Sequence, residues 1–271
     1  MTKARFAAIQ MTAGIDPDAN LRVAEELIGK AADAGAQLVV LPENFAAMGA
    51  SEADRCELAE PDGDGPLQAF LAAQSARRGV WVVGGTIPIV SDDPQRPYAS
   101  TLVFSADGAR VARYDKIHLF DVGLPGRDES YRESAHTRAG STPLTFTTPW
   151  GEICVAVCYD LRFPELFRQF SAPGPDFIVL PAAFTELTGQ AHWSILLRSR
   201  AIENQCFVVA AAQSGAHENG RRTYGHSIIV GPWGQVMAGA GTEPGFIFAD
   251  LDLAEQAEIR KRFPTWDHRK L

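Results

Sequence analysis

Several features that define other protein classes are missing from this sequence of 271 residues. It has four cysteines, Cys56, Cys154, Cys158 and Cys206, which are too few and too scattered for a disulfide framework. No apolar run approaches the length of a membrane span, and no charged leader followed by a long apolar stretch precedes the first strand-like segment. These absences predict a cytoplasmic protein with no membrane partner.

Positive charge is also in short supply. The chain has 25 Lys and Arg against 33 Asp and Glu, a formal net charge of −8, and its basic residues form no cluster. Nucleic acids and anionic membrane surfaces attract basic patches. We therefore expect neither as a partner, and a small molecule is the expected ligand.

The motifs of metal-dependent and serine hydrolases are absent as well. The six histidines form no His-x-His or His-Glu-x-x-His pattern, and residues 62–65 (DGDG) lack the later ligands of a calcium loop. No Gly-x-Ser-x-Gly elbow is present. The sequence predicts no metal and no cofactor.

What the sequence does contain is an alternation of helix and strand patterns. Asp16 and Pro17 open a helix over residues 16–34, whose apolar residues recur at helical spacing. Short apolar runs typical of buried strands are residues 37–42, 80–89, 153–158 and 177–181. This alternation predicts an α/β protein with a mixed sheet, most economically one domain over residues 1–271.

The remaining segments extend this pattern. Residues 101–117 predict a hairpin, and residues 122–140 predict a long irregular insertion, which in a compact domain is more often functional than decorative. Residues 190–204 predict a helix with an apolar stripe. Later strands are expected at residues 206–212, 226–230 and 246–251, before a closing helix at 253–262.

Cys158 lies where a strand passes into a helix, whose first turn suits Pro164. Such a turn lifts a side chain clear of the sheet and points free backbone N–H groups at whatever that side chain attacks. A covalent nucleophile is one interpretation of Cys158. The alternative is a buried cysteine at the end of a core strand, which is the commoner fate of a cysteine considered alone.

Two further ionisable residues follow predicted strands. Glu43 comes directly after residues 37–42, and Lys116 lies near the end of the predicted hairpin. A solvated loop carboxylate or a helix cap is the alternative for Glu43, and a solvated strand-end cation is the alternative for Lys116.

Three segments carry a resemblance to a known family. Residues 41–45 (LPENF), 114–121 (YDKIHLFD) and 157–165 (VCYDLRFPE) resemble the signature segments of the nitrilase superfamily of carbon–nitrogen hydrolases. The resemblance covers nearly the whole chain. It implies a four-layer α-β-β-α sandwich of two mixed sheets with outer helices, and a homodimer or higher even oligomer formed through helices that follow the nucleophile strand.

The resemblance also implies roles for individual residues. Cys158 would be the nucleophile, Glu43 the general acid and base, and Lys116 the positive group that stabilises the oxyanion. Glu133 falls where the family carries a second glutamate, which would hold Lys116 and orient the substrate, and the Tyr159 N–H would be a second oxyanion donor. Phe184 and Thr185 are expected to bind substrate. Arg162, one turn on from Cys158 in the sequence, could bind a substrate carboxylate, and a structural role is its alternative.

Within the superfamily, segments 183–193, 200–206, 210–213 and 224–227 are most similar to the branch that contains deaminated glutathione amidase and ω-amidase. The expected activity is hydrolysis of a terminal amide of a small carboxylic acid through a thioester, with release of the amine or ammonia. The expected substrate is deaminated glutathione or a related ω-amide of a 2-oxo acid.

Other functions remain open at this point. An N-carbamoyl amino-acid amidohydrolase or a nitrilase would use the same residues, although true nitrilases usually follow the cysteine with a Trp-Glu pair, absent here. A catalytically silent binding module of the same fold is a third alternative. The presence of Glu43, Lys116, Glu133 and Cys158 together argues against it.

Overall fold

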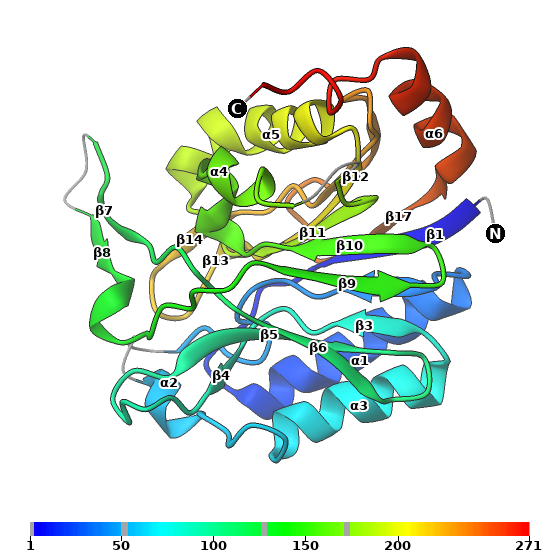
Figure 1. The fold of residues 1–271 in the computed structure, drawn as a ribbon. Helices are drawn as coiled ribbons and strands as arrows, with labels where there is room; N and C mark the ends of the chain where they lie inside the picture. Colours follow the sequence, from blue (N-terminus) through cyan, green and yellow to red (C-terminus); the bar gives the residue numbers. More distant parts are fainter. Residues whose placement is uncertain (1–2, 50–53, 126–128, 171–173, 271) are drawn as a thin grey trace.

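The computed structural model of the protein describes residues 3–49, 54–125, 129–170 and 174–270. Two β-sheets lie face to face, and helices cover both outer faces, so the layers run α-β-β-α (Figure 1). The predicted four-layer sandwich with mixed sheets is confirmed. Within the described part of the chain, no helix is both long enough and apolar enough to cross a bilayer.

The first sheet has the strand order β17-β1-β2-β3-β5-β4, with β6 also paired to β5. β1, β2 and β3 run parallel, whereas β17 pairs antiparallel with β1 along its whole length. The strands are β1 (Lys3–Gln10), β2 (Leu38–Val40), β3 (Trp81–Val83), β4 (Ile87–Ile89), β5 (Tyr98–Phe104), β6 (Arg110–Asp115) and β17 (Gly245–Asp252).

The second sheet has the order β16-β15-β12-β11-β10-β9 and a parallel centre of β10, β11 and β12. Its strands are β9 (Leu144–Thr148), β10 (Gly151–Val155), β11 (Phe177–Ala182), β12 (Phe207–Ala212), β15 (Ile228–Val230) and β16 (Val236–Gly239). Two small hairpins lie outside both sheets: β7 (Asp121–Gly123) with β8 (Ser130–Arg132), and β13 (Ser214–Ala216) with β14 (Arg222–Tyr224).

Strand alternation explains how the two sheets share a core. Along β1, Phe6 packs in the cluster between the sheets, and Ile9 packs in the cluster beneath the outer helices. The Phe6 ring lies 4.8 Å from that of Phe177 and 5.2 Å from that of Trp150. These aromatic contacts join the sheets at the middle of the sandwich.

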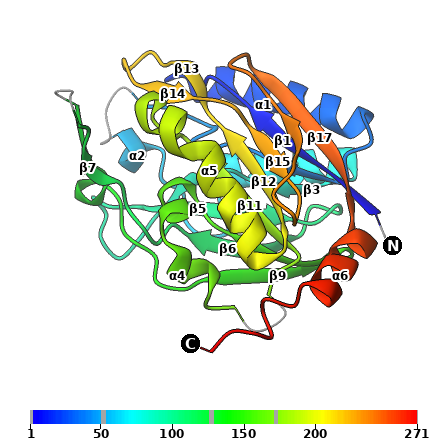
Figure 2. The ribbon, with the colours of Figure 1, turned by 90° about the horizontal axis from the view of Figure 1, so that it is seen from above.

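The helices cover opposite faces. They are α1 (Pro17–Asp33), α2 (Asp54–Glu57), α3 (Pro66–Arg78), α4 (Pro164–Phe167), α5 (Glu186–Asn204) and α6 (Leu253–Arg262). The Asp16 carboxylate accepts a hydrogen bond from the N–H of Asp18, which confirms the predicted cap of α1. Seen from above, α5 crosses β11 and β12 (Figure 2).

Helix α5 differs from its prediction in two respects. It begins at Glu186, earlier than residue 190, because Thr185 already provides the extended N-cap backbone. The predicted apolar stripe, with Trp193, Leu197 and Ala201 in it, is buried in the core cluster that includes the second sheet. The stripe is therefore an internal packing face and does not by itself indicate a subunit interface.

Residues 80–89 are not one strand, as predicted, but two. β3 ends at Val83, and β4 begins at Ile87 on the far edge of β5. Between them Gly85 has φ 54°, and a Cβ atom at this position would lie 2.1 Å from the carbonyl oxygen of Pro42. Only glycine permits this turn against the residue that precedes Glu43.

Residues 122–140, predicted to be irregular, contain regular structure. The β7–β8 hairpin projects from the side of the sandwich (Figure 1), and the 3₁₀ turn η1 (Glu133–Ala135) follows it directly. The segment is therefore built around a hairpin, and its second strand leads directly to Glu133.

Candidate active site

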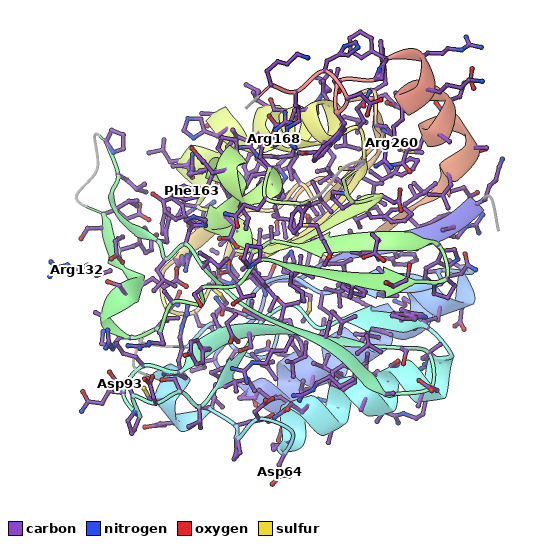
Figure 3. All side chains as sticks on the ribbon, in the orientation of Figure 1. Asp64, Asp93, Arg132, Phe163, Arg168 and Arg260 are labelled. Atoms are coloured by element: carbon purple, nitrogen blue, oxygen red, sulfur yellow. The ribbon has the colours of Figure 1, made fainter. Side chains whose placement is uncertain are left out.

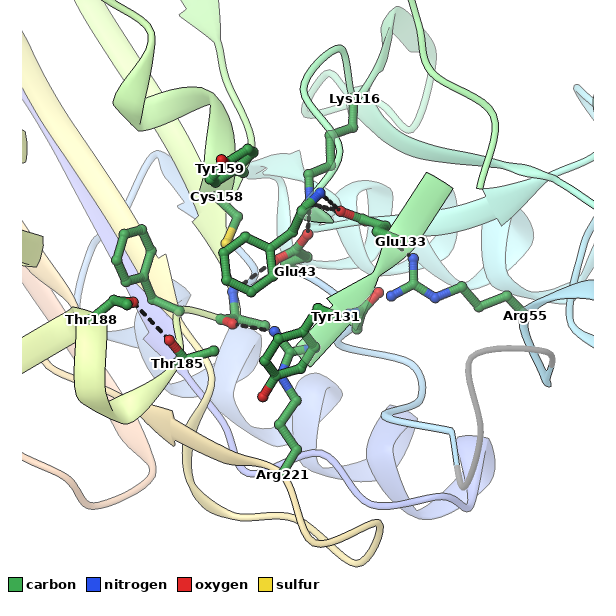
Figure 4. Close-up of a pocket in the computed structure, with 14 residues that line it drawn as sticks. Glu43, Arg55, Lys116, Tyr131, Glu133, Cys158, Tyr159, Thr185, Thr188 and Arg221 are labelled. Atoms are coloured by element: carbon green, nitrogen blue, oxygen red, sulfur yellow. Dashed lines mark hydrogen bonds and ion pairs between the residues drawn. The ribbon is translucent and has the colours of Figure 1, made fainter. Parts of the chain in front are cut away.

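Strand ends from both sheets meet at one pocket of about 440 Å³. Glu43 follows β2, Lys116 follows β6, Glu133 begins η1, and Cys158 begins the 3₁₀ turn η2 (Cys158–Arg162) after β10. All four line the pocket (Figure 4). The structure thus brings together the four residues that the sequence proposed for catalysis, although they are far apart along the chain.

Lys116 is the centre of this cluster. Its Nζ lies 2.8 Å from Oε1 of Glu43 and 2.8 Å from Oε2 of Glu133, and the residue is only 2% exposed. Burial acts to lower the pKa of Lys116, but the charges of Glu133 and Glu43 outweigh it, and the pKa is raised. The side chain is therefore an ammonium ion at neutral pH, and not the solvated cation of the alternative interpretation.

Glu133 fixes the position of that ammonium. It accepts hydrogen bonds from Nζ of Lys116 through both carboxylate oxygens and from the N–H of Phe120 at 2.7 Å, and Arg55 Nη1 approaches Oε1 at 3.4 Å. Burial acts to raise the pKa of Glu133, but Lys116 and Arg55 together lower it. Glu133 is thus an ionised carboxylate that balances the charge of Lys116, and both of its oxygens already accept hydrogen bonds.

Glu43 has its second oxygen free of the lysine. Oε2 accepts a hydrogen bond from the N–H of Ala183 at 2.8 Å, and the Glu43 carbonyl accepts one from Nε2 of Gln213 at 3.0 Å. The next residue, Asn44, has φ 55°, a conformation that asparagine tolerates better than most residues. Glu43 is 3% exposed, so it is neither a solvated loop carboxylate nor a helix cap.

Asp160 explains how the Cys158 turn is held. Its carboxylate accepts hydrogen bonds from the N–H of Val157 at 2.8 Å, the hydroxyl of Tyr114 at 2.7 Å and the N–H of His118 at 3.0 Å. Tyr114 and His118 flank Lys116 in the chain. One buried carboxylate therefore ties the turn that carries the thiol to the strand end that carries the ammonium.

Cys158 itself has φ 45°, a left-handed conformation uncommon for a residue with a side chain. Burial and the neighbouring Glu43 raise the pKa of its thiol, while Lys116 acts in the opposite direction and only partly offsets them. The thiol therefore keeps its proton at neutral pH in the free protein. A base beside it can take that proton as the sulfur attacks an amide, which is a poor electrophile.

The structure places some of the residues predicted to contact substrate in the pocket lining, and one outside it. Tyr159, Phe184 and Thr185 line the pocket. Arg162 does not line it: its Nη1 lies 3.1 Å from Nδ1 of His192, and its guanidinium lies 4.9 Å from the centre of the Phe184 ring, which separates it from the pocket.

Sequence reasoning missed several residues that line this pocket, among them Arg55 of α2, Tyr131 of β8 and Arg221, which immediately precedes β14. Tyr131 lies in the insertion that was predicted to be functional, so a signal existed for it. Arg221 is one of two adjacent arginines in a polar loop, and nothing in the sequence distinguishes it from Arg222.

The acidic turn before α3 lies away from this pocket. Asp64 points outward at the edge of the molecule (Figure 3). Across the described ranges, no group of three or more His, Cys, Asp or Glu side chains is placed to hold a metal ion.

Comparisons with known proteins identify the family of the chain. The family model described as carbon-nitrogen hydrolase matches residues 5–261. A protein of Synechocystis named deaminated glutathione amidase is 40% identical over 97% of both chains.

Solved structures are similar over the whole chain. The nitrilase superfamily protein Nit3 of Saccharomyces cerevisiae has a TM-score of 0.89 and 31% identity, covering 100% of this chain and 97% of that one. The NitFhit protein of C. elegans has a TM-score of 0.92 and 36% identity, covering 100% of this chain and 66% of that one. The chain belongs to the carbon–nitrogen hydrolase family.

Proposed function

We propose that this carbon–nitrogen hydrolase is a cysteine-dependent amidase whose substrate is deaminated glutathione or a related ω-amide of a 2-oxo acid. The observation that carries the mechanism is the buried arrangement of Glu43, Lys116 and Glu133 in the pocket that Cys158 lines. The choice of substrate is supported by the relative named deaminated glutathione amidase, which matches 97% of the chain.

Acylation begins with transfer of the Cys158 proton to Glu43. The sulfur attacks the amide carbon, and the negative charge that develops on the carbonyl oxygen is stabilised by Lys116 and the N–H of Tyr159. Glu43 then returns the proton to the amide nitrogen, the carbon–nitrogen bond breaks, and the amine leaves. The acyl group remains on sulfur as a thioester.

Deacylation reverses these roles. Glu43 takes a proton from water, the resulting hydroxide attacks the thioester carbon, and the carbon–sulfur bond breaks as the thiol regains its proton. Glu133 does not exchange protons in this scheme, because Lys116, Arg55 and a backbone N–H already lower its pKa. Its part is to hold Lys116 where the oxyanion forms.

A panel of substrates tests the proposed reaction. We expect the purified protein to hydrolyse deaminated glutathione and α-ketoglutaramate with higher kcat/KM than N-carbamoyl amino acids or simple nitriles, measured by release of amine or ammonia. A preference for carbamoyl compounds or nitriles would move the protein to another activity of the family. Tight binding of these compounds without turnover would identify a silent binding module.

We also propose a homodimer or higher even oligomer. On α5, Ile195 is 68% exposed and Ile202, two turns on, is 50% exposed. Trp233 is 62% exposed and packs edge-on against Phe263. Gly234, which follows Trp233, lies against the Ile202 side chain, so exposed apolar residues occur together at this end of α5, which supports an isologous interface.

Light scattering at micromolar concentration should give at least twice the 29.3 kDa mass of one chain. Ile202→Lys places a charge in the proposed interface and should shift the protein towards the monomer. Val111→Lys is the matched control, because Val111 is a similarly exposed aliphatic residue on β6 of the first sheet. A monomeric wild-type protein would contradict the proposal.

A cytoplasmic location is proposed too, supported by the unpaired state of all four cysteines.

A further inference from the structure

One cation that lines the pocket, Arg221, forms no ion pair with the carboxylates around Lys116. Its charged lining consists of two carboxylates, Glu43 and Glu133, and three cations, Lys116, Arg55 and Arg221. Lys116 pairs with both carboxylates, and Arg55 pairs with Glu133. Among the described residues no carboxylate pairs with Arg221. The pocket lining thus carries a surplus positive charge.

The backbone fixes where Arg221 begins. Its N–H donates to Oδ1 of Asn219 at 3.0 Å, and its carbonyl accepts from the N–H of His217 at 2.8 Å. His217 is itself held between the Ala13 carbonyl and the hydroxyl of Thr223, at 2.9 and 2.7 Å. The arginine therefore projects from a tightly closed turn and not from a loose loop.

The guanidinium is also oriented, but only partly satisfied. Nη2 donates to the carbonyl of Ala183 at 2.8 Å, and the group lies 5.0 Å from the centre of the Tyr131 ring (Figure 4). Nε is buried without a hydrogen-bond partner, and Nη1 bonds to no group in the described part of the chain. Of the buried side-chain atoms without a partner in the described part of the chain, this Nε is the one on a charged group, and it belongs to a residue that lines the pocket, where a bound anion would satisfy it.

Ala183 connects this arginine to the chemistry. Its carbonyl accepts from Arg221, while its N–H donates to Oε2 of Glu43. A group bound by Arg221 is therefore connected through Ala183 to Glu43, the carboxylate that moves the proton. A smaller recess adjoins the pocket, and Arg221, Asn44 and Arg55 line both.

We propose that Arg221 binds a carboxylate of the amide substrate and so makes this pocket select anionic amides. The inference rests on the proposed amidase function. Guanidinium groups bind carboxylates through charge-assisted, often paired hydrogen bonds. Arg162, the other arginine considered for substrate binding, is directed to His192 and does not line the pocket.

The carboxylate has two possible sources, the acyl part or the leaving group, and three substrates distinguish them. The ω-amide of 2-oxoglutaric acid carries it on the acyl part, N-pentanoylglycine carries it on the leaving group, and pentanamide lacks it. In Arg221→Gln we expect the ratio of kcat/KM for the relevant anionic amide to that for pentanamide to fall by about 10- to 150-fold, the range for a hydrogen bond to a charged group. The anionic substrate whose ratio falls identifies the source.

Two variants complete this test. Arg222→Gln is the matched control, since Arg222 pairs with Glu186 outside the pocket and its loss should leave the ratio unchanged. Arg221→Lys keeps the charge and should retain part of the selectivity. Equal losses on all three substrates in Arg221→Gln leave the ratio unchanged; they would show that Arg221 only supports Ala183 and would overturn the inference.

A binding measurement separates failure of this inference from failure of the proposed function. In the Cys158→Ala background, calorimetry should detect binding of 2-oxoglutarate or of N-pentanoylglycine, according to which side carries the recognised carboxylate. Adding Arg221→Gln should weaken the affinity by the same factor of about 10 to 150. This holds whether or not the wild type hydrolyses any amide in the panel. Equal affinity with and without Arg221 would contradict the inference alone.

Discussion

Alanine in place of Cys158 should abolish amide hydrolysis and leave the protein folded. We expect a loss on the order of 10⁶-fold, the scale on which removal of a covalent nucleophile acts in hydrolases. The fold should survive because the substitution removes a single sulfur atom, and the bonds that hold the turn belong to Asp160 and Val157. Turnover and thermal unfolding, measured on the same preparation, check both halves of this expectation.

Mass spectrometry gives the more specific test. With a slow substrate, the wild type should carry an acyl group on Cys158, and the variant should carry none. Cys154→Ala is the matched control: Cys154 is also buried and has a raised pKa, but it lies in the core, so the variant should still form the adduct. An adduct on Cys56, Cys154 or Cys206 would contradict the assignment.

Glu43→Gln and Lys116→Ala should both inactivate the enzyme, but at different steps. Loss of the Glu43 carboxylate removes proton transfer in acylation and deacylation, which typically costs about 10²–10⁴-fold. An amide side chain also cannot accept hydrogen bonds from both Lys116 and the N–H of Ala183 through two oxygens, as Glu43 does. With an activated ester this variant should acylate and then stall, so that the thioester accumulates.

Lys116→Ala acts earlier in the reaction. It removes oxyanion stabilisation, worth about 10²–10³-fold for one donor, and leaves Glu43 and Glu133 buried without their shared counter-charge. Acylation itself should slow, and no intermediate should accumulate. Lys116→Met keeps the volume of the side chain without the charge and separates the loss of charge from the effect of a cavity.

Single-turnover kinetics with an activated ester distinguish these outcomes. The double variant should lose less than the product of the two single losses, because residues that act as a unit lose most of their effect together. Strictly multiplicative losses would indicate that the two side chains act independently. Near-normal rates in either single variant would exclude that residue from the chemistry.

Local signals in the sequence predicted the alternation of helices and strands, and the family resemblance supplied the four layers. Apolar runs that end in Glu43 or Cys158 mark strand ends, and strand ends of an α/β sandwich are where ligand sites form. The helix over residues 16–34 was confirmed because its cap, proline and apolar spacing agree. The convergence of Glu43, Lys116, Glu133 and Cys158 followed from the family resemblance, and their catalytic roles remain predictions.

What the sequence could not give depends on contacts between distant segments. Gly85 breaks the strand predicted at 80–89 because it lies against Pro42, a contact that no local pattern encodes. Arg162 was favoured for its proximity to Cys158 in sequence, but the turn directs it to His192. Arg221 reaches the pocket only because a hairpin folds over Ala183.

The pairing of the first and last strands has a consequence for how the protein is made. β1 is synthesised well before its antiparallel partner β17, because most of the described chain lies between them. At about 5–20 residues per second, one edge of β1 stays open for a time on the order of tens of seconds. The apolar residues Phe6, Ala7, Ala8 and Ile9 then form an unpaired strand edge, the kind that joins other chains. The nascent chain is most vulnerable to aggregation during this interval, and release of β17 ends it.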